Sequence, residues 1–167
     1  MLVLGAGGAA QAALAVALLE HGDVRLAVRH VAAARAVLDA FWQRAHAAQP
    51  QQPPEDQHTR VISLSDERAL ANVLTQTDIL INATPVGTGD PEASPLDTTL
   101  LRQLPPSAFV FDMVYNPPET ALVRAARSAG RRATGGLLML LYQGAEAFTL
   151  WTHTDAPLEV MRHALGL

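Results

Sequence analysis

The chain has 167 residues, of which 49% are hydrophobic and 17% charged, the size and balance of one globular domain. Its formal net charge is −4 and its arginines are scattered, so we expect no nucleic-acid partner. It contains no Cys and no Lys, which excludes disulfides, thiolate metal sites, a thiol nucleophile and a catalytic or phosphate-binding lysine. No apolar run reaches the ~20 residues that a bilayer requires and no basic leader segment is present, so we expect no membrane partner and a cytoplasmic location.

Short β-branched runs alternate with longer Ala- and Leu-rich runs, a pattern typical of βαβ units around a parallel sheet. The predicted strands are, in chain order, Leu2–Leu4, Val24–Val28, Arg60–Ser63, Asp78–Asn82, Phe109–Asp112 and Arg131–Thr134. The predicted helices are Gly8–His21, Val31–Ala47, Asp66–Val73, Glu119–Ser128, Leu137–Trp151 and Leu158–Leu165. This order predicts an α/β fold: a Rossmann-type, doubly wound, mostly parallel six-stranded sheet in three αβα layers, with residues 1–167 forming a single domain.

Two stretches of low hydrophobicity interrupt this pattern. The segment His46–His58 is rich in Pro and Gln, so we expect a solvated connection that is too short to separate two domains. The segment Gly87–Thr99 is interpreted as a functional or connecting loop. The His residues have no spacing typical of metal ligands, so no metal site is expected.

The strongest local signal is the turn between the first predicted strand and the first predicted helix. The segment Gly5–Ala10 has the sequence Gly-Ala-Gly-Gly-Ala-Ala, the pattern G-x-G-x-x-A in its required context. Gly5 permits the tight turn, Gly7 lets the backbone approach a pyrophosphate, and Ala10 keeps the helix close to the strand. The first amides of the helix then face the ligand's negative charge. We predict a dinucleotide site, the alternative being a turn with only a steric role; the candidate contacts are Gly5, Ala6, Gly7, Gly8 and Ala9.

The end of the second predicted strand indicates which dinucleotide is bound. An NAD site places Asp or Glu there to accept hydrogen bonds from the ribose 2′-OH. Here the strand runs into Arg29 and His30, and no carboxylate occurs from the strand to Leu38. A guanidinium binds the 2′-phosphate that a carboxylate would repel, so NADP is favoured over NAD. Arg29 is the main candidate and Arg35 and His30 are further candidates, the alternative for all three being a solvated edge.

Three blocks in the second half follow predicted strands or lie in a predicted helix. Asn82–Gly87 reads Asn-Ala-Thr-Pro-Val-Gly, Asp112–Pro117 reads Asp-Met-Val-Tyr-Asn-Pro, and Tyr142–Ala145 reads Tyr-Gln-Gly-Ala. In this order and after the glycine turn, the blocks resemble the C-terminal half of the shikimate dehydrogenases. These are NADP-dependent enzymes that reduce 3-dehydroshikimate to shikimate in aromatic amino acid biosynthesis. The likeness extends from Leu2 to about Leu165.

The resemblance implies a role in cofactor binding for each matching residue. The glycine turn holds the pyrophosphate and Arg29 holds the adenosine 2′-phosphate. Thr84 lies on the ribose side of the nicotinamide half. Met113, Gly136 and Met139 line the nicotinamide pocket, Gly136 through its carbonyl, and the alternative for Met139 is core packing.

The resemblance also implies two substrate-binding residues, Tyr115 and Gln143. A phenol and an amide suit this role because they hydrogen-bond a carboxylate or ring hydroxyls without adding a competing charge. The implied partner is the small-molecule substrate, shikimate or 3-dehydroshikimate. Asp112 is interpreted as a turn-stabilising carboxylate rather than as a catalyst.

The chain departs from the family pattern in two places. The family has a second Arg four positions after the first, where this chain has Ala33, with Arg35 two residues further on. Leu138 stands where a Gly is common in the opening of the following helix. The first departure predicts a weaker or rearranged clamp on the 2′-phosphate, and the second predicts an altered backbone near the nicotinamide.

The largest departure concerns a domain. Shikimate dehydrogenases carry an N-terminal substrate domain with a catalytic Lys and its Asp partner, whereas this chain begins at the first Rossmann strand. The resemblance therefore implies the cofactor half of a two-domain enzyme, with no catalytic residue of its own and with little or no activity alone. The helices in 137–167 are expected to pack partly on the missing domain.

Two other functions stay open. The first is a stand-alone regulatory or interaction module in which the last two predicted helices bind a partner or form a homodimer, because their apolar surface would otherwise be exposed. The second is a relative with another substrate, such as a quinate dehydrogenase, where an acidic residue at the position of Arg29 would accompany NAD use.

Overall fold

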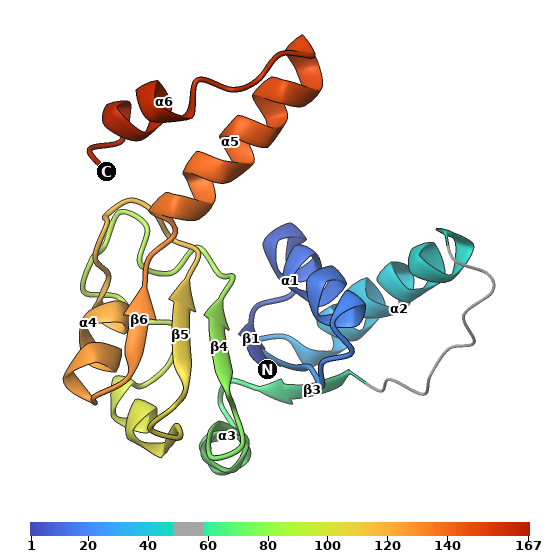
Figure 1. Ribbon diagram of the computed structural model, residues 1–167. Coiled ribbons are helices and arrows are strands. Elements are labelled where there is room, and N and C mark those ends of the chain that lie inside the picture. Colours follow the sequence, from blue (N-terminus) through green and yellow to red (C-terminus); the bar gives the residue numbers. More distant parts are fainter. Residues whose placement is uncertain (49–58) are drawn as a thin grey trace.

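The computed structural model describes residues 1–48 and 59–167 (Figure 1). Its strands are β1 (Leu2–Leu4), β2 (Arg25–Val28), β3 (Arg60–Ser63), β4 (Ile79–Asn82), β5 (Phe109–Asp112) and β6 (Arg132–Thr134). Its helices are α1 (Gly8–Leu19), α2 (Val31–Ala48), α3 (Glu67–Leu74), the 3-10 helix η1 (Thr98–Gln103), α4 (Ala121–Ser128), α5 (Leu137–Thr152) and α6 (Leu158–Ala164). Every predicted strand and helix is confirmed, with bounds that differ by two residues or fewer.

The six strands form one sheet in the order β3-β2-β1-β4-β5-β6, and each neighbouring pair is parallel. Helices α1 and α2 cover one face, while α3, α4 and η1 cover the other (Figure 1). Side chains alternate along each strand, so Leu2 and Leu4 pack beneath α3 and α4, whereas Val3 packs beneath α1 and α2. The predicted doubly wound Rossmann-type fold is confirmed.

Two expectations about the connections are corrected by the structure. Helix α2 continues to Ala48, because an Ala-rich sequence favours helix, so His46 belongs to the helix. The remainder of the predicted Pro- and Gln-rich connection, 49–58, lies outside the described residues. The loop that follows β4 runs into η1, which the sequence pattern did not predict because a single short 3-10 helix has little periodicity. Asp97 caps η1 by accepting a hydrogen bond from the N–H of Thr99 (2.9 Å).

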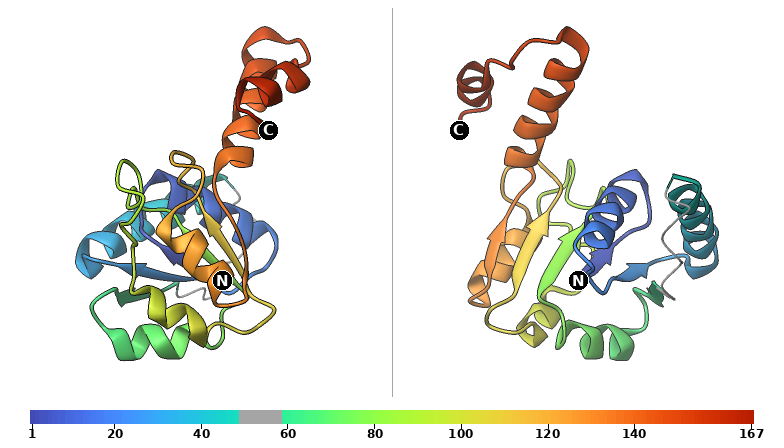
Figure 2. Two further views of the ribbon diagram at one scale, coloured as in Figure 1. Left: turned by 90° about the vertical axis from the view of Figure 1, so that its left-hand side faces the viewer. Right: turned by 45° about the vertical axis from the view of Figure 1, so that its right-hand side comes forward.

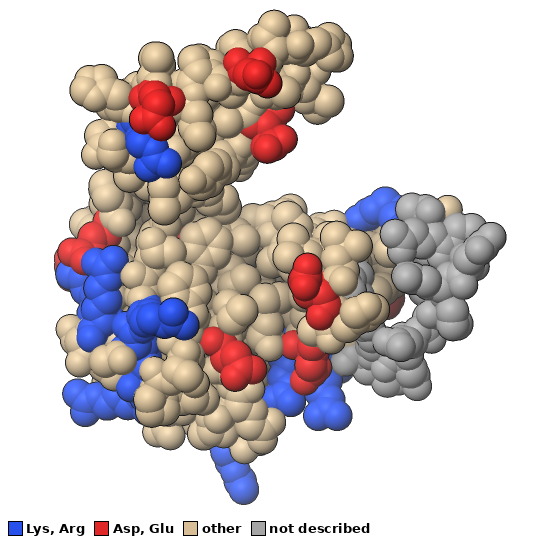
Figure 3. Space-filling view, viewed as in Figure 1, with Lys and Arg blue, Asp and Glu red and all other residues tan. Residues whose placement is uncertain are grey.

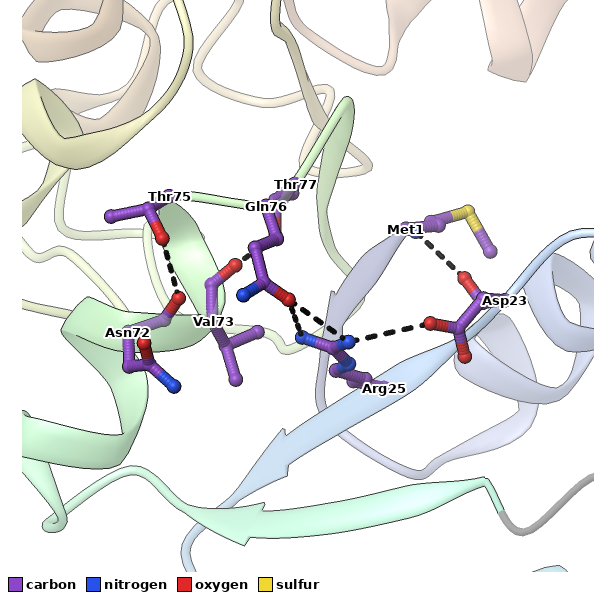
Figure 4. A network of polar contacts seen from close by, with 8 residues as sticks. All are labelled: Met1, Asp23, Arg25, Asn72, Val73, Thr75, Gln76 and Thr77. Carbon is purple, nitrogen blue, oxygen red and sulfur yellow. Dashed lines mark hydrogen bonds and ion pairs between the residues drawn. The ribbon is translucent and has the colours of Figure 1, made fainter.

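A polar network ties the elements together at the edge of the sheet where the strands begin (Figure 4). The guanidinium of Arg25, at the start of β2, donates to Gln76 Oε1 at 3.3 Å and pairs with Asp23 at 3.4 Å. The hydroxyl of Thr77 donates to the carbonyl of Val73 at 2.9 Å and so closes the end of α3. These contacts hold the turn between α3 and β4 against β2.

Helices α5 and α6 lie apart from the sheet and from the helices that cover it. Helix α5 begins beyond β6 and projects outward, and α6 lies beside it (Figures 1 and 2). The two helices approach closely at Gly144, where a Cβ atom would lie 3.2 Å from the side chain of Met161. Large apolar side chains are exposed on this pair, namely Leu138, Tyr142, Leu150, Trp151 and Val160. No helix in the described residues is long and apolar enough to cross a membrane.

Candidate functional site

The loops that follow the strands all start along one edge of the sheet, the carboxyl edge. The N–H groups of Gly5, Ala83 and Met113 donate to carbonyls at the ends of β2, β1 and β4, with N···O distances of 2.9, 2.9 and 3.0 Å. The first residue after each of these three strands is therefore still hydrogen-bonded to the neighbouring strand. The carboxyl edge faces a hollow between the α5–α6 pair and the rest of the described chain (Figure 1). Figure 3 shows few charged side chains on the visible surface of this hollow. Ligands of open α/β sheets bind at this edge.

The glycine turn between β1 and α1 meets two different demands. Gly5 has φ +108°, and a Cβ there would lie 3.0 Å from the carbonyl oxygen of Ala83 and 3.2 Å from Thr84 Cγ2. The chain itself thus requires glycine at this position, and the turn lies against Thr84. At Gly7 and Gly8, by contrast, a Cβ would meet no other described atom within 4 Å. Nothing in the packing of the described residues requires glycine there.

The burial of the residues next to Gly7 and Gly8 agrees with the predicted start of the first helix. Ala10 is fully buried, which lets α1 pack closely on the sheet, while Ala6 is half-buried and Ala9 is exposed. The first N–H groups of an α-helix have no partner within the helix, and at α1 they lie beside the exposed glycines. This arrangement is the one that binds anions at helix N-termini.

The three basic candidates lie at the end of β2 and in the helix that follows it. Arg29 and His30 come directly after β2, and the carbonyl of His30 accepts the N–H of Ala34 at 3.1 Å as α2 begins. Arg35 lies within α2. All three side chains are exposed, and none forms a hydrogen bond or ion pair with another described residue. Because β2 is the neighbour of β1, Arg29 stands next to the glycine turn.

A buried set of polar side chains, the Asp112 network, joins the ends of β4 and β5. Asp112, Asn82 and Thr120 are each 1% exposed or less. Asp112 accepts hydrogen bonds from Asn82 Nδ2 (2.8 Å), from Thr120 Oγ1 (2.6 Å) and from the N–H of Val114 (3.0 Å). Asn82 Oδ1 accepts from both the N–H (3.0 Å) and the hydroxyl (2.7 Å) of Thr84. The predicted site residue Thr84 is therefore oriented by this network.

The environment of Asp112 shifts the pKa of its carboxyl. Burial raises the pKa of the Asp112 carboxyl, and the hydrogen bonds from Thr120, Val114 and Asn82 oppose that rise. The bond from Val114 is the turn-stabilising contact that the sequence indicates for Asp112. The sequence reasoning missed Thr120, which also caps α4 by accepting the N–H of Val123 at 3.3 Å. A Thr directly before an apolar helical run was the available signal.

The glycine pair at the start of α5 packs against the loop after β5. A Cβ at Gly136 would lie 2.7 Å from the carbonyl carbon of Met113, and a Cβ at Gly135 would lie 2.8 Å from the carbonyl oxygen of Pro118. The N–H of Gly136 donates to the carbonyl of Val114 at 2.9 Å. The structure thus brings together the predicted nicotinamide-pocket residues Met113 and Gly136, because only glycine allows the two backbones to approach this closely.

The remaining candidates lie at the same end of the molecule. Met139 is half-buried in the first turn of α5 and belongs to neither core cluster. Tyr115, in the loop after β5, and Gln143, in α5, are exposed and form no hydrogen bond with another described residue. Among the described residues there is no group of three or more His, Cys, Asp or Glu side chains that could hold a metal ion.

Comparison with known proteins finds shikimate and quinate/shikimate dehydrogenases as relatives. The family model for the shikimate 5′-dehydrogenase C-terminal domain matches residues 136–165. The chain is 39% identical over 170 residues to a quinate/shikimate dehydrogenase of Escherichia coli O139:H28, in a match that covers 99% of this chain and 55% of that protein. It therefore spans about half the length of the curated relatives it matches.

Solved structures agree with this result. Shikimate 5-dehydrogenase from Listeria monocytogenes, in complex with shikimate and NAD, has a TM-score of 0.78 and 28% identity, covering 99% of this chain and 55% of its own. The shikimate 5-dehydrogenase from Thermus thermophilus, in complex with NADP(H) and shikimate, has a TM-score of 0.70 and 34% identity, covering 98% and 53%. The strand order, the motif blocks and these relatives lead to one conclusion: over nearly its whole length, the chain is similar to about half of the shikimate and quinate/shikimate dehydrogenases.

Proposed function

We propose that this chain binds NADP(H) along the carboxyl edge of its sheet and serves as the dinucleotide-binding part of a shikimate dehydrogenase. Two observations carry the proposal: the backbone at Gly7 and Gly8 after β1 is open, and Arg29, which follows the neighbouring strand β2, has a guanidinium with no partner among the described residues. Packing within the described part of the chain gives no reason for either feature, whereas a phosphorylated dinucleotide gives a reason for both. The Listeria monocytogenes and Thermus thermophilus relatives bind NAD and NADP(H), respectively.

The residues present fit such a cofactor. The N–H groups at the start of α1 hold the pyrophosphate, and Arg29 binds the adenosine 2′-phosphate, with His30 and Arg35 available nearby. Thr84, Met113 and Gly136, with Met139 beside them, hold the nicotinamide half. When bound, the nicotinamide supplies or accepts the hydride. The chain's contribution is to bind and orient the cofactor in a hollow with few charged groups.

The substrate and the rest of the enzyme belong to the same proposal. Tyr115 and Gln143, which bond to no other described residue, can hydrogen-bond the hydroxyls or carboxylate of shikimate. The resemblance implies a Lys as the proton donor, and the chain contains no Lys, so this donor belongs to the part of the relatives that the chain does not span. The exposed apolar surface of α5 and α6, in 137–167, packs on that further part.

A titration tests the cofactor proposal. The purified chain is titrated with NADP⁺ and with NAD⁺ by calorimetry, and we expect tighter binding of NADP⁺. Arg29→Gln should weaken NADP⁺ binding by about 1.5–3 kcal/mol, the usual contribution of a charged hydrogen bond, and leave NAD⁺ binding unchanged. The matched control is Arg132→Gln, which removes an exposed guanidinium at the start of β6, over the ring of Phe109. Failure to bind either dinucleotide at millimolar concentration would refute the proposal.

The exposed apolar surface also favours a second candidate function, an interaction module. Trp151 is 79% exposed and Leu150 is 71% exposed, and exposed apolar side chains that gather on one part of a molecule often mark an interaction surface. In that case the chain would form a homodimer or bind a partner through α5 and α6. Sedimentation that reveals a dimer disrupted by Trp151→Ser, with no dinucleotide binding, would favour this function. A quinate dehydrogenase is separated from a shikimate dehydrogenase by comparing the two substrates in an enzyme of full family length.

A further inference from the structure

One buried ionisable group takes no part in the proposed cofactor contacts. Asp112 is fully buried at the end of β5, and its three hydrogen-bond donors come from three different elements. Asn82 belongs to β4, Thr120 caps α4, and Val114 belongs to the loop after β5. Loss of any one donor would leave a buried carboxylate short of partners, which is unfavourable. The Asp112 network therefore holds these three elements in one arrangement.

One arm of the network reaches the loop after β4. The amide of Asn82 donates to Asp112 and to the carbonyl of Val86 (3.2 Å), so its oxygen is directed at Thr84. That oxygen then receives both the N–H and the hydroxyl of Thr84. The position of Thr84 at the carboxyl edge depends on Asp112 through a single intervening side chain.

A second arm reaches the start of α5. Asp112 holds the N–H of Val114, and the carbonyl of Val114 accepts the N–H of Gly136 at 2.9 Å. The Gly136 backbone lies directly against Met113. The same carboxylate thus controls where the loop after β5 and the first turn of α5 stand relative to Thr84. Within the described part of the chain, the Gly7–Gly8 backbone and Arg29 share no hydrogen bond with the network.

We infer that Asp112 is a positioning residue for the nicotinamide half of the cofactor, which sets the separation between Thr84 on one side and Met113 with Gly136 on the other. The inference rests on the proposed function. It separates the binding site into two parts. The adenosine half is held by the glycine turn and Arg29 alone, while the nicotinamide half needs the buried carboxylate.

Two ligands distinguish these halves in a binding experiment. NADPH spans the whole site, whereas adenosine 2′,5′-bisphosphate carries the 2′-phosphate but has no nicotinamide. Thr120→Val keeps the size of the side chain and removes the donor to Asp112, and Thr120→Ser retains the hydroxyl. We expect Thr120→Val to weaken NADPH binding about tenfold and to change bisphosphate binding less than about twofold, because only one half loses its preorganisation. Thr120→Ser should bind both ligands like the unsubstituted chain.

Asp112→Asn provides the second test, with Asp97→Asn as its matched control. Asp97 also accepts a backbone N–H at a helix start, but it is exposed and lies outside the network. We expect Asp112→Asn to reproduce the NADPH-specific loss and Asp97→Asn to bind both ligands normally. If circular dichroism shows that Asp112→Asn is unfolded, the two Thr120 variants decide the question.

The possible results separate this inference from the proposed function. Equal weakening of both ligands by Thr120→Val would indicate general damage and overturn the inference, and so would unchanged NADPH binding. A folded, unsubstituted chain that binds neither ligand would refute the proposed function, and the inference would fall with it. Loss of NADPH binding alone, restored in Thr120→Ser, supports the inference.

Discussion

The two halves of the carboxyl edge are built in opposite ways. On the β1–β2 side, the backbone around Gly7 is open and Arg29 has no partner among the described residues. On the β4–β5–β6 side, the polar side chains satisfy one another inside the protein, and Gly136 is packed against the backbone of Met113. The chain's own packing explains the second half, whereas the first half would be explained by the proposed dinucleotide. Substitutions in the first half should therefore change binding, whereas those in the second should change stability as well.

The largest expected effect comes from adding a Cβ atom at Gly136, where the backbone packs against Met113. Gly136→Ala places a Cβ 2.7 Å from the carbonyl carbon of Met113, and neither backbone can move without disturbing β5 or α5. We expect the free energy of unfolding to fall by about 3 kcal/mol, the upper part of the usual range for overpacking. Urea denaturation followed by circular dichroism measures the change. A loss below about 1 kcal/mol would mean that the loop after β5 yields easily.

The same substitution at Gly7 should weaken NADP⁺ binding without lowering the free energy of unfolding. A Cβ at Gly7 would meet no described atom nearby, so Gly7→Ala should leave the free energy of unfolding unchanged or raise it by about 0.5 kcal/mol, by restricting the unfolded chain. The added methyl group occupies the space proposed for the pyrophosphate, so NADP⁺ affinity should fall at least about tenfold, or ~1.4 kcal/mol. Calorimetric titration and denaturation of the same sample test both statements. Unimpaired binding would place the cofactor elsewhere.

The pH dependence of stability distinguishes the buried carboxylate from an exposed one. Burial raises the pKa of Asp112 above its usual 3.8, so between 3.8 and the raised value the folded state binds more protons than the unfolded state. The free energy of unfolding, relative to that of Asp112→Asn, should fall as pH rises through this interval. The residues that donate to the carboxylate, Asn82, Thr120 and Val114, carry no charge that would reverse the sign.

Asp97 should behave in the opposite way. The N–H of Thr99 holds the pKa of Asp97 below 3.8, so its contribution is present above pH 3.8 and is lost as pH falls through the folded-state pKa. Denaturation curves of Asp97→Asn and Asp112→Asn, each compared with the unsubstituted chain from pH 3 upward, measure both trends. Two curves with the same sign would contradict the assignment.

The smallest effect is expected at the opposite edge of the sheet. Arg25→Gln removes an ion pair to the exposed carboxylate of Asp23 and two long contacts to Gln76. Pairs of this kind contribute little, so the free energy of unfolding should fall by about 0.5 kcal/mol or less. NADP⁺ affinity should not change, because the network lies where the strands begin. A change in affinity would indicate that the two edges are coupled.

The sequence alone determined the fold class, and it also predicted a candidate anion site on the β1–β2 side of the carboxyl edge. Short β-branched runs between longer Ala- and Leu-rich runs predicted all six strands, because a parallel sheet covered on both faces needs continuous hydrophobic segments. The pattern around Gly5 and Gly7 indicated an anion site, because the conformational freedom of glycine and the helix N-terminus are both local properties. The residues Thr84, Met113 and Gly136 were selected by family resemblance, without a physical reason for their proximity.

Tertiary structure decided what holds these residues together. Thr120 lies far from Asn82 in the sequence, and only the adjacency of β4 and β5 with the start of α4 places both on the Asp112 carboxylate. Register between strands and the close approach of backbones are nonlocal, so no sequence window contains them. The glycine at position 5 is required by the loop after β4 and the glycine at position 136 by the loop after β5, and neither neighbour is close in the chain. Local chemistry thus indicates what the site can bind, while long-range packing fixes the geometry in which it binds.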